Sequence, residues 1–414
     1  MNNFPFIDGI LHTESVAVTD LMAQYGSPLY IYSRSEIESN WQKYEEAFSD
    51  HRHLICFAVK SNSNLAVLNI LAKLGAGFDV VSIGELHRVI EAGGDSSKCV
   101  FSGVGKSVEE IKEALGIGIY CFNIESESEL DRIITVAESI GVVAPISVRV
   151  NPDVDAKTHP YISTGLKENK FGVDIESALS LYRKAENSKS IKVCGVDYHI
   201  GSQITEVSPF MDALDKVFEL ISQLSSEGIE IEHLDIGGGL GINYDNTQTI
   251  NISDYIRDVK SKAGDLEILI EPGRSVVGSA GIFVTKVEYL KHNLEKSFAI
   301  VDGAMNDLLR PSLYSAYHKA VIVQKSENGQ SGIWDLVGPI CETGDFLAKD
   351  RDLTIAEGDY VAFMSAGAYC FSMSSNYNTR PRVAEVMVWR DNHTIIRARE
   401  TIKELYRNEK VIDG

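Results

Sequence analysis

A lysine ends an apolar run near the start of the sequence, in the stretch CFAVKSNSN that covers residues 56–64. Burying an ammonium group costs free energy unless the group is paired, neutralised or used covalently. Lys60 is therefore either the point where a strand reaches solvent or a reactive amine held at a site. Residues elsewhere in the chain must decide between these two interpretations.

Two glycine-rich turns offer a place for a phosphate group. The segment DIGGGLGI (235–242) places three successive glycines after an apolar run, and glycine lets backbone amides approach an anion closely. Alone, this pattern is more often a simple tight turn. The segment EPGRSVVGSAG (271–281) adds a second turn with an arginine and a carboxylate. Together they predict a phosphate site that includes Gly238, Gly239, Pro272, Gly273 and Arg274.

Pyridoxal phosphate would give these residues a common purpose. Lys60 would form a Schiff base with it, so the amine need not remain a buried ammonium. Glu271 would lie beside the pyridine nitrogen and keep it protonated, which makes the ring an electron sink. His199 would lie flat against the ring. At this point a solvated lysine, a capping glutamate and a core histidine with satisfied hydrogen bonds remain open as alternatives.

The elements that must position these residues appear as eight short β-prone runs, the first four separated by segments with helical apolar spacing. The runs cover residues 54–60, 77–82, 99–103, 120–125, 146–151, 193–202, 231–239 and 268–274. Eight such units over roughly 220–240 residues predict a (β/α)8 barrel, in which functional residues lie at the C-terminal ends of the strands. Those ends carry Lys60, Asn151, His199, Ser202, Gly237–Gly239, Glu271 and Arg274.

A second domain is indicated by β-rich sequence after residue 280, including GIFVTKVEYLK, SFAIVDG and RVAEVMVW. The strand-like segment GSPLYIYS (26–33) precedes the first barrel unit. We therefore expect an α/β fold with a barrel domain over residues 34–280. A C-terminal all-β domain, a Greek-key barrel or sandwich, should cover 281–414 and be completed by the N-terminal segment 1–33.

Composition limits the partners that this chain can have. Its 414 residues carry a formal net charge of −20, which argues against binding nucleic acid. The start, MNNFPFIDGI, shows no signal-peptide pattern, and no apolar run reaches the roughly 18–20 residues of a membrane span. We expect a cytoplasmic protein that does not bind membranes. The six cysteines show no metal-ligand spacing, so no metal site is predicted.

A family resemblance joins these separate patterns. The segments FAVKSN, GFDVVSIGEL, HIGSQ, GGGLGI, EPGR, AMNDLLRPSLYSAYH, GPICETGDFLAKDR and SAGAYCFSMSSNYNTRPR occur in this order between residues 57 and 382. Together they resemble the diaminopimelate decarboxylase family, pyridoxal-phosphate enzymes of the alanine-racemase-like barrel class (group IV decarboxylases). The resemblance extends over nearly the whole chain. It implies a homodimer in which the β domain of one copy completes the active site of the other.

The resemblance also implies a role for each matching residue. Lys60 and Cys341 correspond to the catalytic pair, the Schiff-base lysine and the proton donor. The cofactor would contact Lys60, His199, Ser202, Gly238, Gly239, Glu271, Pro272, Gly273, Arg274 and Tyr369. The substrate would contact Arg274, Arg310, Tyr314, Glu342 and Tyr369.

The activity implied is decarboxylation of meso-2,6-diaminopimelate at one amino-acid centre, through a quinonoid intermediate, to give L-lysine and CO2 in the last step of lysine biosynthesis. The substrate has a second carboxylate that arginines can bind, while Glu342 takes the amine beside it. A decarboxylase of ornithine, arginine or carboxynorspermidine is the alternative and would share Lys60 and the glycine turns. A racemase usually faces the pyridine nitrogen with arginine, which Glu271 disfavours. A non-catalytic relative would lose Lys60 or Cys341.

Overall fold

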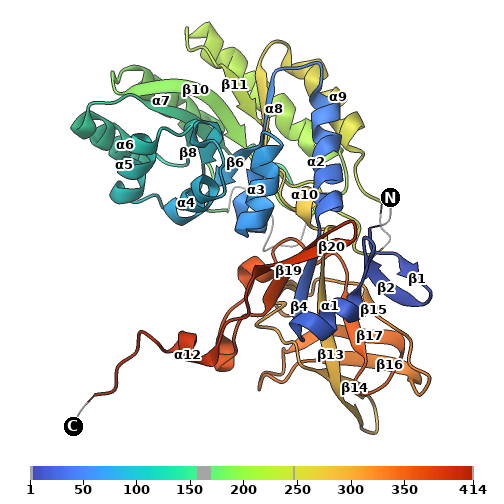
Figure 1. Ribbon diagram of the computed structural model, residues 1–414. Helices are drawn as coiled ribbons and strands as arrows, with labels where there is room; N and C mark the ends of the chain where they lie inside the picture. Colours follow the sequence, from blue (N-terminus) through green and yellow to red (C-terminus); the bar gives the residue numbers. More distant parts are fainter. Residues whose placement is uncertain (1–2, 156–168, 246–247, 413–414) are drawn as a thin grey trace. The chain divides into compact units, whose positions relative to one another are not determined.

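Eight parallel strands close into a barrel, as the sequence predicts (Figure 1). Around the barrel they follow the order β10-β11-β12-β5-β6-β7-β8-β9, so each strand pairs with its neighbours in the chain and β12 closes on β5. The strands are β5 (His53–Ala58), β6 (Gly77–Val80), β7 (Cys99–Phe101), β8 (Cys121–Ile124), β9 (Ala144–Val150), β10 (Ile191–Tyr198), β11 (His233–Asp235) and β12 (Glu267–Ile270).

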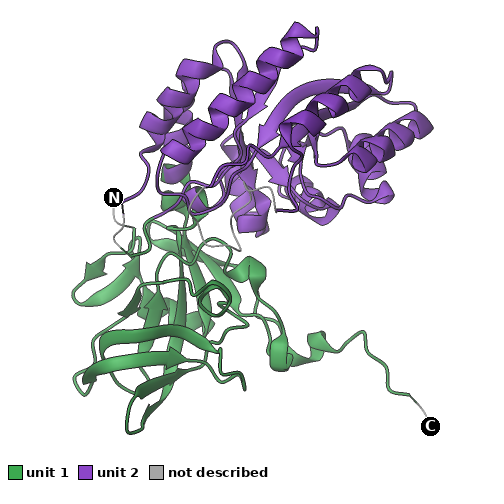
Figure 2. Cartoon of the chain, turned by 180° about the vertical axis from the view of Figure 1, so that it is seen from behind, with its two compact units in different colours: residues 1–39, 243–247, 276–414 green, residues 40–242, 248–275 purple. Residues whose placement is uncertain are grey.

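The structure, a computed structural model, describes residues 3–155, 169–245 and 248–412. The chain forms two compact units (Figure 2). The barrel unit comprises residues 40–242 and 248–275, and the β unit comprises residues 1–39, 243–247 and 276–414. The sequence-based boundaries were 34–280 for the barrel and 1–33 with 281–414 for the β domain.

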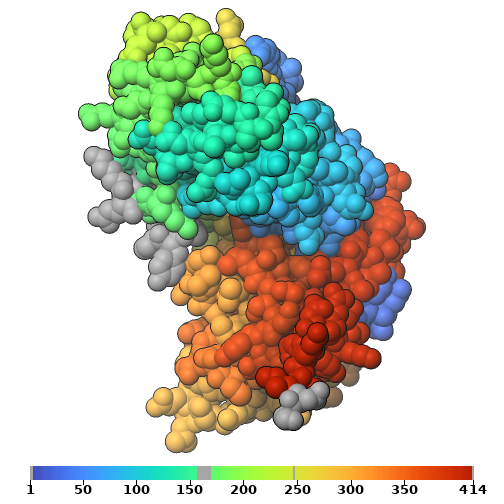
Figure 3. All heavy atoms as spheres, turned by 90° about the vertical axis from the view of Figure 1, so that its left-hand side faces the viewer, coloured from blue at the N-terminus to red at the C-terminus, as the bar shows by residue number. Residues whose placement is uncertain are grey.

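Helices alternate with the barrel strands. Polar capping residues mark where helices begin, and each helix buries its apolar face. Ser82, Ser107, Ser126, Asp174 and Asn251 each accept a backbone N–H bond at a helix start. In Figure 3 the teal atoms of α5 and α6 lie on the outside of this unit. The helices of this layer are α2 (Arg34–Phe48), α3 (Leu65–Lys73), α4 (Ile83–Glu91), α5 (Val108–Ile117), α6 (Glu127–Ile140), α7 (Ile175–Glu186), α8 (Ser208–Ser226) and α9 (Ile252–Ala263).

The main sheet of the β unit is a mixed sheet of nine strands, which agrees with the all-β domain that the sequence predicts. Its main order is β17-β16-β14-β13-β4-β19-β20, and β18 pairs with both β13 and β15. The strands are β4 (Leu29–Ser33), β13 (Gly281–His292), β14 (Ser297–Val301), β15 (Ala320–Ile322), β16 (Gln330–Val337), β17 (Phe346–Ile355), β18 (Tyr360–Phe363), β19 (Ala384–Trp389) and β20 (Asn392–Arg397). The N-terminal strand β4 lies between β13 and β19, antiparallel to the first and parallel to the second.

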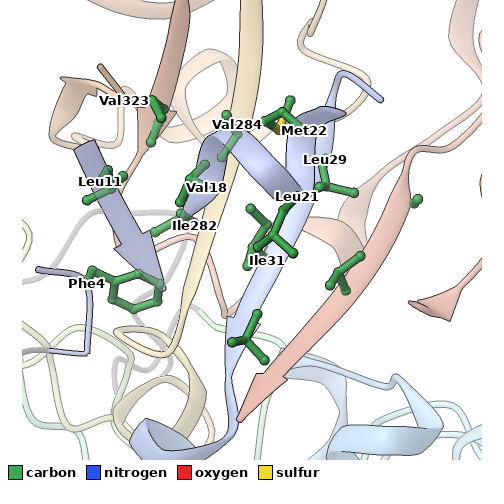
Figure 4. Packing of buried hydrophobic residues seen from close by; sticks show 14 residues of the cluster. Phe4, Leu11, Val18, Leu21, Met22, Leu29, Ile31, Ile282, Val284 and Val323 are labelled. Atoms are coloured by element: carbon green, nitrogen blue, oxygen red, sulfur yellow. The ribbon is translucent and has the colours of Figure 1, made fainter. Parts of the chain in front are cut away.

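Smaller elements complete the β unit. Strands β1 (Phe6–Ile7), β2 (Ile10–Thr13) and β3 (Val16–Ala17) form a separate sheet, and α1 (Val18–Tyr25) follows them. The apolar face of α1 packs with β4 and β13 in a cluster that includes Leu21, Ile31 and Ile282, all fully buried (Figure 4). The remaining short helices are α10 (Arg274–Val277), α11 (Arg310–Tyr314) and α12 (Ile402–Leu405).

Among the described residues, no helix combines the length and the apolar character that crossing a bilayer requires.

Candidate active site

Lys60 lies immediately after β5, in the 3-10 turn η1 (Val59–Ser61) at the C-terminal end of the strand. Its Nζ donates to Oδ2 of Asp79 over 2.6 Å, and the Asp79 side chain is fully buried in β6. The Lys60 side chain is 38% exposed, so part of it can be reached by a ligand. A buried carboxylate thus holds the Lys60 amine in place. This arrangement is expected of a lysine that forms a covalent bond with a ligand and is not expected of a lysine fully surrounded by water.

The glycine turn after β11 is built so that nothing larger than glycine fits. A Cβ on Gly238 would lie 2.3 Å from the Glu271 carbonyl oxygen, and one on Gly239 would lie 2.4 Å from that of Gly201. Gly239 also has φ +104°, which favours glycine. The Gly238 N–H donates to Nδ1 of His199 over 3.0 Å. Because Nδ1 accepts, the neutral ring carries its proton on Nε2.

The EPGR turn after β12 joins the lysine turn. The Ala58 N–H donates to the Pro272 carbonyl oxygen over 3.1 Å. A Cβ on Gly273 would lie 2.9 Å from the Ser61 side chain, so the two turns approach closely. The guanidinium of Arg274, which is 6% exposed, donates to Oγ of Ser202 over 3.0 Å. The barrel therefore brings the nine predicted cofactor contacts in this unit to neighbouring strand ends.

Buried carboxyl groups crowd this end of the barrel. Oxygens of Asp197, Asp235 and Glu271 lie within 4.8 Å of one another, and we call these three residues the acidic cluster. Burial and the neighbouring carboxylates hold the pKa of Glu271 well above its usual range. Burial raises the pKa of Asp235 to about 6 and that of Asp197 well above normal. A cationic ring nitrogen would be stabilised here.

The cofactor-free protein is expected to lose stability as pH rises through about 6, where Asp235 titrates. Its folded pKa is above the ordinary 3.8, so the stabilisation is complete below pH 3.8 and is lost as pH rises through 6. In the wild type, Oδ1 of Asp235 accepts the Gly237 N–H over 2.9 Å, and the amide oxygen of Asp235→Asn can accept the same bond. Above pH 7, the free energy of unfolding of the variant should exceed that of the wild type by a value on the order of 2 kcal/mol, because asparagine cannot ionise.

Urea unfolding of the cofactor-free protein across this pH range checks the prediction. Asp212→Asn, on the exposed face of α8, is the matched control and should follow the wild-type profile. Identical pH profiles for Asp235→Asn and the wild type would contradict the assignment.

The surroundings of His199 lower the pKa of its imidazole. Burial and the positive charges of Arg149 and Lys60 hold its pKa well below the usual range, so the ring stays neutral. A neutral imidazole can lie against an aromatic ring without adding a second positive charge beside a pyridinium. The Arg149 guanidinium itself pairs with Glu125 over 3.3 Å and lies 3.8 Å from Asp197.

The residues present fit pyridoxal phosphate. Glu271 Oε1 is buried and has no hydrogen-bond partner among the described residues, as expected of an acid that faces a ring nitrogen. The glycine turn carries no side chains, which suits the close approach of a phosphate to the backbone. Lys60 supplies the amine that would hold the cofactor covalently.

The remaining predicted residues belong to the β unit, where Cys341 and Glu342 lie in the loop between β16 and β17. Cys341 is exposed, unlike the other five cysteines, which are buried. Asp345 fixes this loop by accepting the backbone N–H groups of Ile340 and Met305 over 2.8 and 2.6 Å. Tyr377 donates its hydroxyl to Glu342 over 2.5 Å. The thiol and the carboxylate are thus presented on a braced loop.

Arg310 and Tyr314 lie on α11, which the same loop contacts through a Ser312 Oγ bond of 2.7 Å to the Gly344 carbonyl oxygen. Arg310 is 6% exposed and Tyr314 is half-buried. Tyr369 occupies a turn after β18 with φ +56°, a conformation that costs free energy for a tyrosine. Such strain is often found at functional positions.

Sequence reasoning assigned no role to Asp79, Arg149, Asp197 or Asp235. One signal could have found Asp79, Arg149 and Asp197, because each is a charged residue in a mostly apolar barrel strand. A charge at such a position must face a partner or a ligand.

Comparisons with known proteins agree with this geometry. Residues 34–278 match the family model described as the pyridoxal binding domain of pyridoxal-dependent decarboxylases. A diaminopimelate decarboxylase from Pseudomonas aeruginosa is 54% identical over 414 residues, covering 100% of both chains. The crystal structure of the Helicobacter pylori enzyme complexed with L-lysine aligns with a TM-score of 0.92 and 44% identity, covering 95% of this chain and 99% of that one.

A more distant structure gives the same result. The M. jannaschii diaminopimelate decarboxylase in complex with L-lysine aligns with a TM-score of 0.94 and 36% identity, covering 99% of this chain and 98% of that one. Full-length identity of this order and the residues at the barrel strand ends point to one conclusion: the chain belongs to the diaminopimelate decarboxylases, a family of pyridoxal-phosphate-dependent enzymes.

Proposed function

We propose that the protein decarboxylates meso-2,6-diaminopimelate at one amino-acid centre and releases L-lysine and CO2. The observation that supports this most directly is the convergence of Lys60, Glu271 and the glycine turn at neighbouring strand ends of one barrel. The comparisons favour this substrate over ornithine, arginine or carboxynorspermidine, because the relatives at 54% identity are diaminopimelate decarboxylases.

Each barrel residue has a proposed task. Lys60 holds the cofactor covalently, and Glu271 binds its ring nitrogen. His199 lies against the ring face in its neutral form. The phosphate contacts are assigned to Ser202, Gly238, Gly239, Pro272, Gly273 and Arg274 of the barrel unit and to Tyr369 of the β unit.

The reaction then requires an electron sink and a proton. The bound cofactor supplies the sink for the electron pair left at the α-carbon when CO2 departs. Glu271 would ionise beside the cationic ring nitrogen, and its negative charge would keep that nitrogen protonated. Cys341 is proposed to return the proton to the α-carbon, and Asp345 holds the loop that presents its thiol.

Substrate choice is assigned to residues that bind the centre that does not react. Arg274 and Arg310 would bind its carboxylate through charge-assisted hydrogen bonds. Glu342 would accept its ammonium group, and Tyr314 and Tyr369 would line the same region. A diamino-monoacid such as ornithine leaves this arginine pair without a partner, which costs binding free energy.

We also propose a homodimer with shared active sites in the cytoplasm. Proton donation to a carbanion needs a site from which water is excluded. Cys341 and Glu342 are both exposed in the single chain. A second copy that covers them would provide that exclusion.

The experiment that tests the function is CO2 release by the cofactor-loaded protein from meso-diaminopimelate, with L-ornithine, L-arginine and L-lysine in parallel. Release from diaminopimelate should exceed release from each diamino-monoacid by about 10²-fold or more, since a charged partner is left unpaired in every other case. Comparable release from ornithine would keep the cofactor chemistry and overturn the roles of Arg274, Arg310 and Glu342.

A further inference from the structure

A fully buried histidine stands directly behind one of the proposed substrate arginines. His318 has no solvent exposure and follows α11 by four residues. Its Nε2 lies 2.8 Å from an Nη atom of Arg310, and its Nδ1 lies 2.9 Å from the Met364 carbonyl oxygen. Both contacts lie within the β unit.

These partners fix the protonation of the ring. A carbonyl oxygen only accepts hydrogen bonds, so Nδ1 must carry a proton and donate it to Met364. A guanidinium only donates, so Nε2 must be unprotonated and accept from Arg310. The neutral tautomer with its proton on Nδ1 is the form that satisfies both contacts. The ring therefore links Arg310 to the backbone of the turn that follows β18.

Tyr244 restricts the arginine from another side. The Arg310 guanidinium lies over the Tyr244 ring, 4.8 Å from its centroid. The same ring meets His318 edge-on, with centroids 5.4 Å apart and an interplanar angle of 80°. A histidine acceptor and an aromatic face thus define the plane of a guanidinium that is itself 6% exposed.

We propose that His318 is a positioning residue that aims Arg310 at the carboxylate that survives the reaction. The inference rests on the proposed function, because it requires Arg310 to bind substrate. A guanidinium recognises a carboxylate through a fixed fork of N–H groups, so its orientation decides how many of these groups reach the ligand. His318 accepts a hydrogen bond from one N–H group of Arg310 and leaves the other N–H groups of the guanidinium for other partners.

The chemistry of the product offers a selective probe. Decarboxylation removes one carboxylate of diaminopimelate, and L-lysine keeps the other together with its amine. The compound 1,5-diaminopentane has both amines of lysine but no carboxylate. A residue that acts through Arg310 must therefore influence lysine and spare 1,5-diaminopentane, whereas general damage to the fold weakens both ligands.

The test uses two substitutions of His318 in the cofactor-loaded enzyme. His318→Phe keeps a ring against Tyr244 and removes both hydrogen bonds, while His318→Gln keeps a donor and an acceptor. His318→Phe should raise KM for meso-diaminopimelate and the inhibition constant of L-lysine by about 10-fold, with kcat within about 3-fold. Inhibition by 1,5-diaminopentane should stay within about 2-fold, and His318→Gln should recover much of the lysine affinity.

Controls separate this inference from the function on which it rests. His292→Phe, on the exposed end of β13, makes the same substitution in the same unit and should match the wild type. Arg310→Met should raise the lysine constant strongly, and adding His318→Phe to it should change little more, because the histidine acts through the arginine. If Arg310→Met leaves lysine binding unchanged, the proposed role of Arg310 fails and this inference falls with it.

Two other outcomes would overturn the proposed role of His318 and leave the proposed function intact. One is a strong effect of Arg310→Met together with no effect of His318→Phe on lysine. Another is equal weakening of lysine and 1,5-diaminopentane by His318→Phe. If that variant does not fold, nitrogen-15 spectra of the wild type carry the test. A proton on Nδ1 and none on Nε2 of His318 supports the inference, and the reverse contradicts it.

Discussion

Replacing Lys60 by alanine should lower decarboxylation of meso-diaminopimelate by about 10⁴-fold or more, since an amine supplied by the protein acts at a very high effective concentration. The other side chains of the site would be unchanged in Lys60→Ala. Asp79, whose carboxylate pairs with Lys60 over 2.6 Å, would remain buried and would lose this partner. The variant should therefore also bind the cofactor more weakly, without a covalent bond.

Two measurements distinguish this effect from unfolding. The visible absorbance of the protein-bound cofactor should disappear on dialysis of Lys60→Ala and persist in the wild type. A small primary amine added to the variant should restore part of the activity, because it replaces the missing nucleophile. Lys73→Ala, on the exposed last turn of α3, removes a lysine from the same unit and should behave as the wild type. Retained activity and absorbance in Lys60→Ala would end the covalent assignment.

The barrel was predictable because its signal is local. Each strand is a short apolar run, and in a parallel barrel consecutive runs pair with each other, as β5 pairs with β6 and β6 with β7. The site residues at strand ends follow from that order. Lys60, His199 and Glu271 are predicted site residues for this reason.

The topology of the β unit was less predictable because its pairings are remote in the chain. Strand β4 near the N-terminus lies between β13 and β19, which are separated from it by more than the whole barrel. The same β13 changes partner along its length, pairing with β4 from Gly281 to Val284 and with β14 from Val287 onwards. Composition indicates strands here, but register and order depend on contacts that no local pattern encodes.

Residues that act through other residues were also beyond sequence reasoning. The charge of Asp79 inside a strand could have marked it as a candidate, but the contacts that Asp79 and His318 make cannot be read from the segments that contain them. Their roles follow from a 2.6 Å bond to Lys60 and a 2.8 Å bond to Arg310. Asp345 is similar, since it lies four residues beyond Cys341 and acts on the loop through backbone N–H groups.

Replacing Cys341 by alanine should lower lysine formation by about 10²–10⁴-fold, the usual contribution of a positioned general acid. Unlike Lys60→Ala, this variant should keep the absorbance of the bound cofactor, because Cys341 lies in the β unit and Lys60 in the barrel unit. Thr343→Ala, in the same exposed loop, is the control and should retain activity. Full activity in Cys341→Ala would assign the proton to another group.

The same variant tests whether two copies share their active sites. Lys60→Ala and Cys341→Ala chains are each nearly inactive alone. If the lysine of one copy works with the cysteine of the other, a mixed dimer contains one site with both residues and one site with neither. Random mixing makes half of all dimers mixed, so co-expression should restore about a quarter of the wild-type activity. If lysine and cysteine act within one chain, every site in a mixed dimer lacks one of them, and mixing restores nothing.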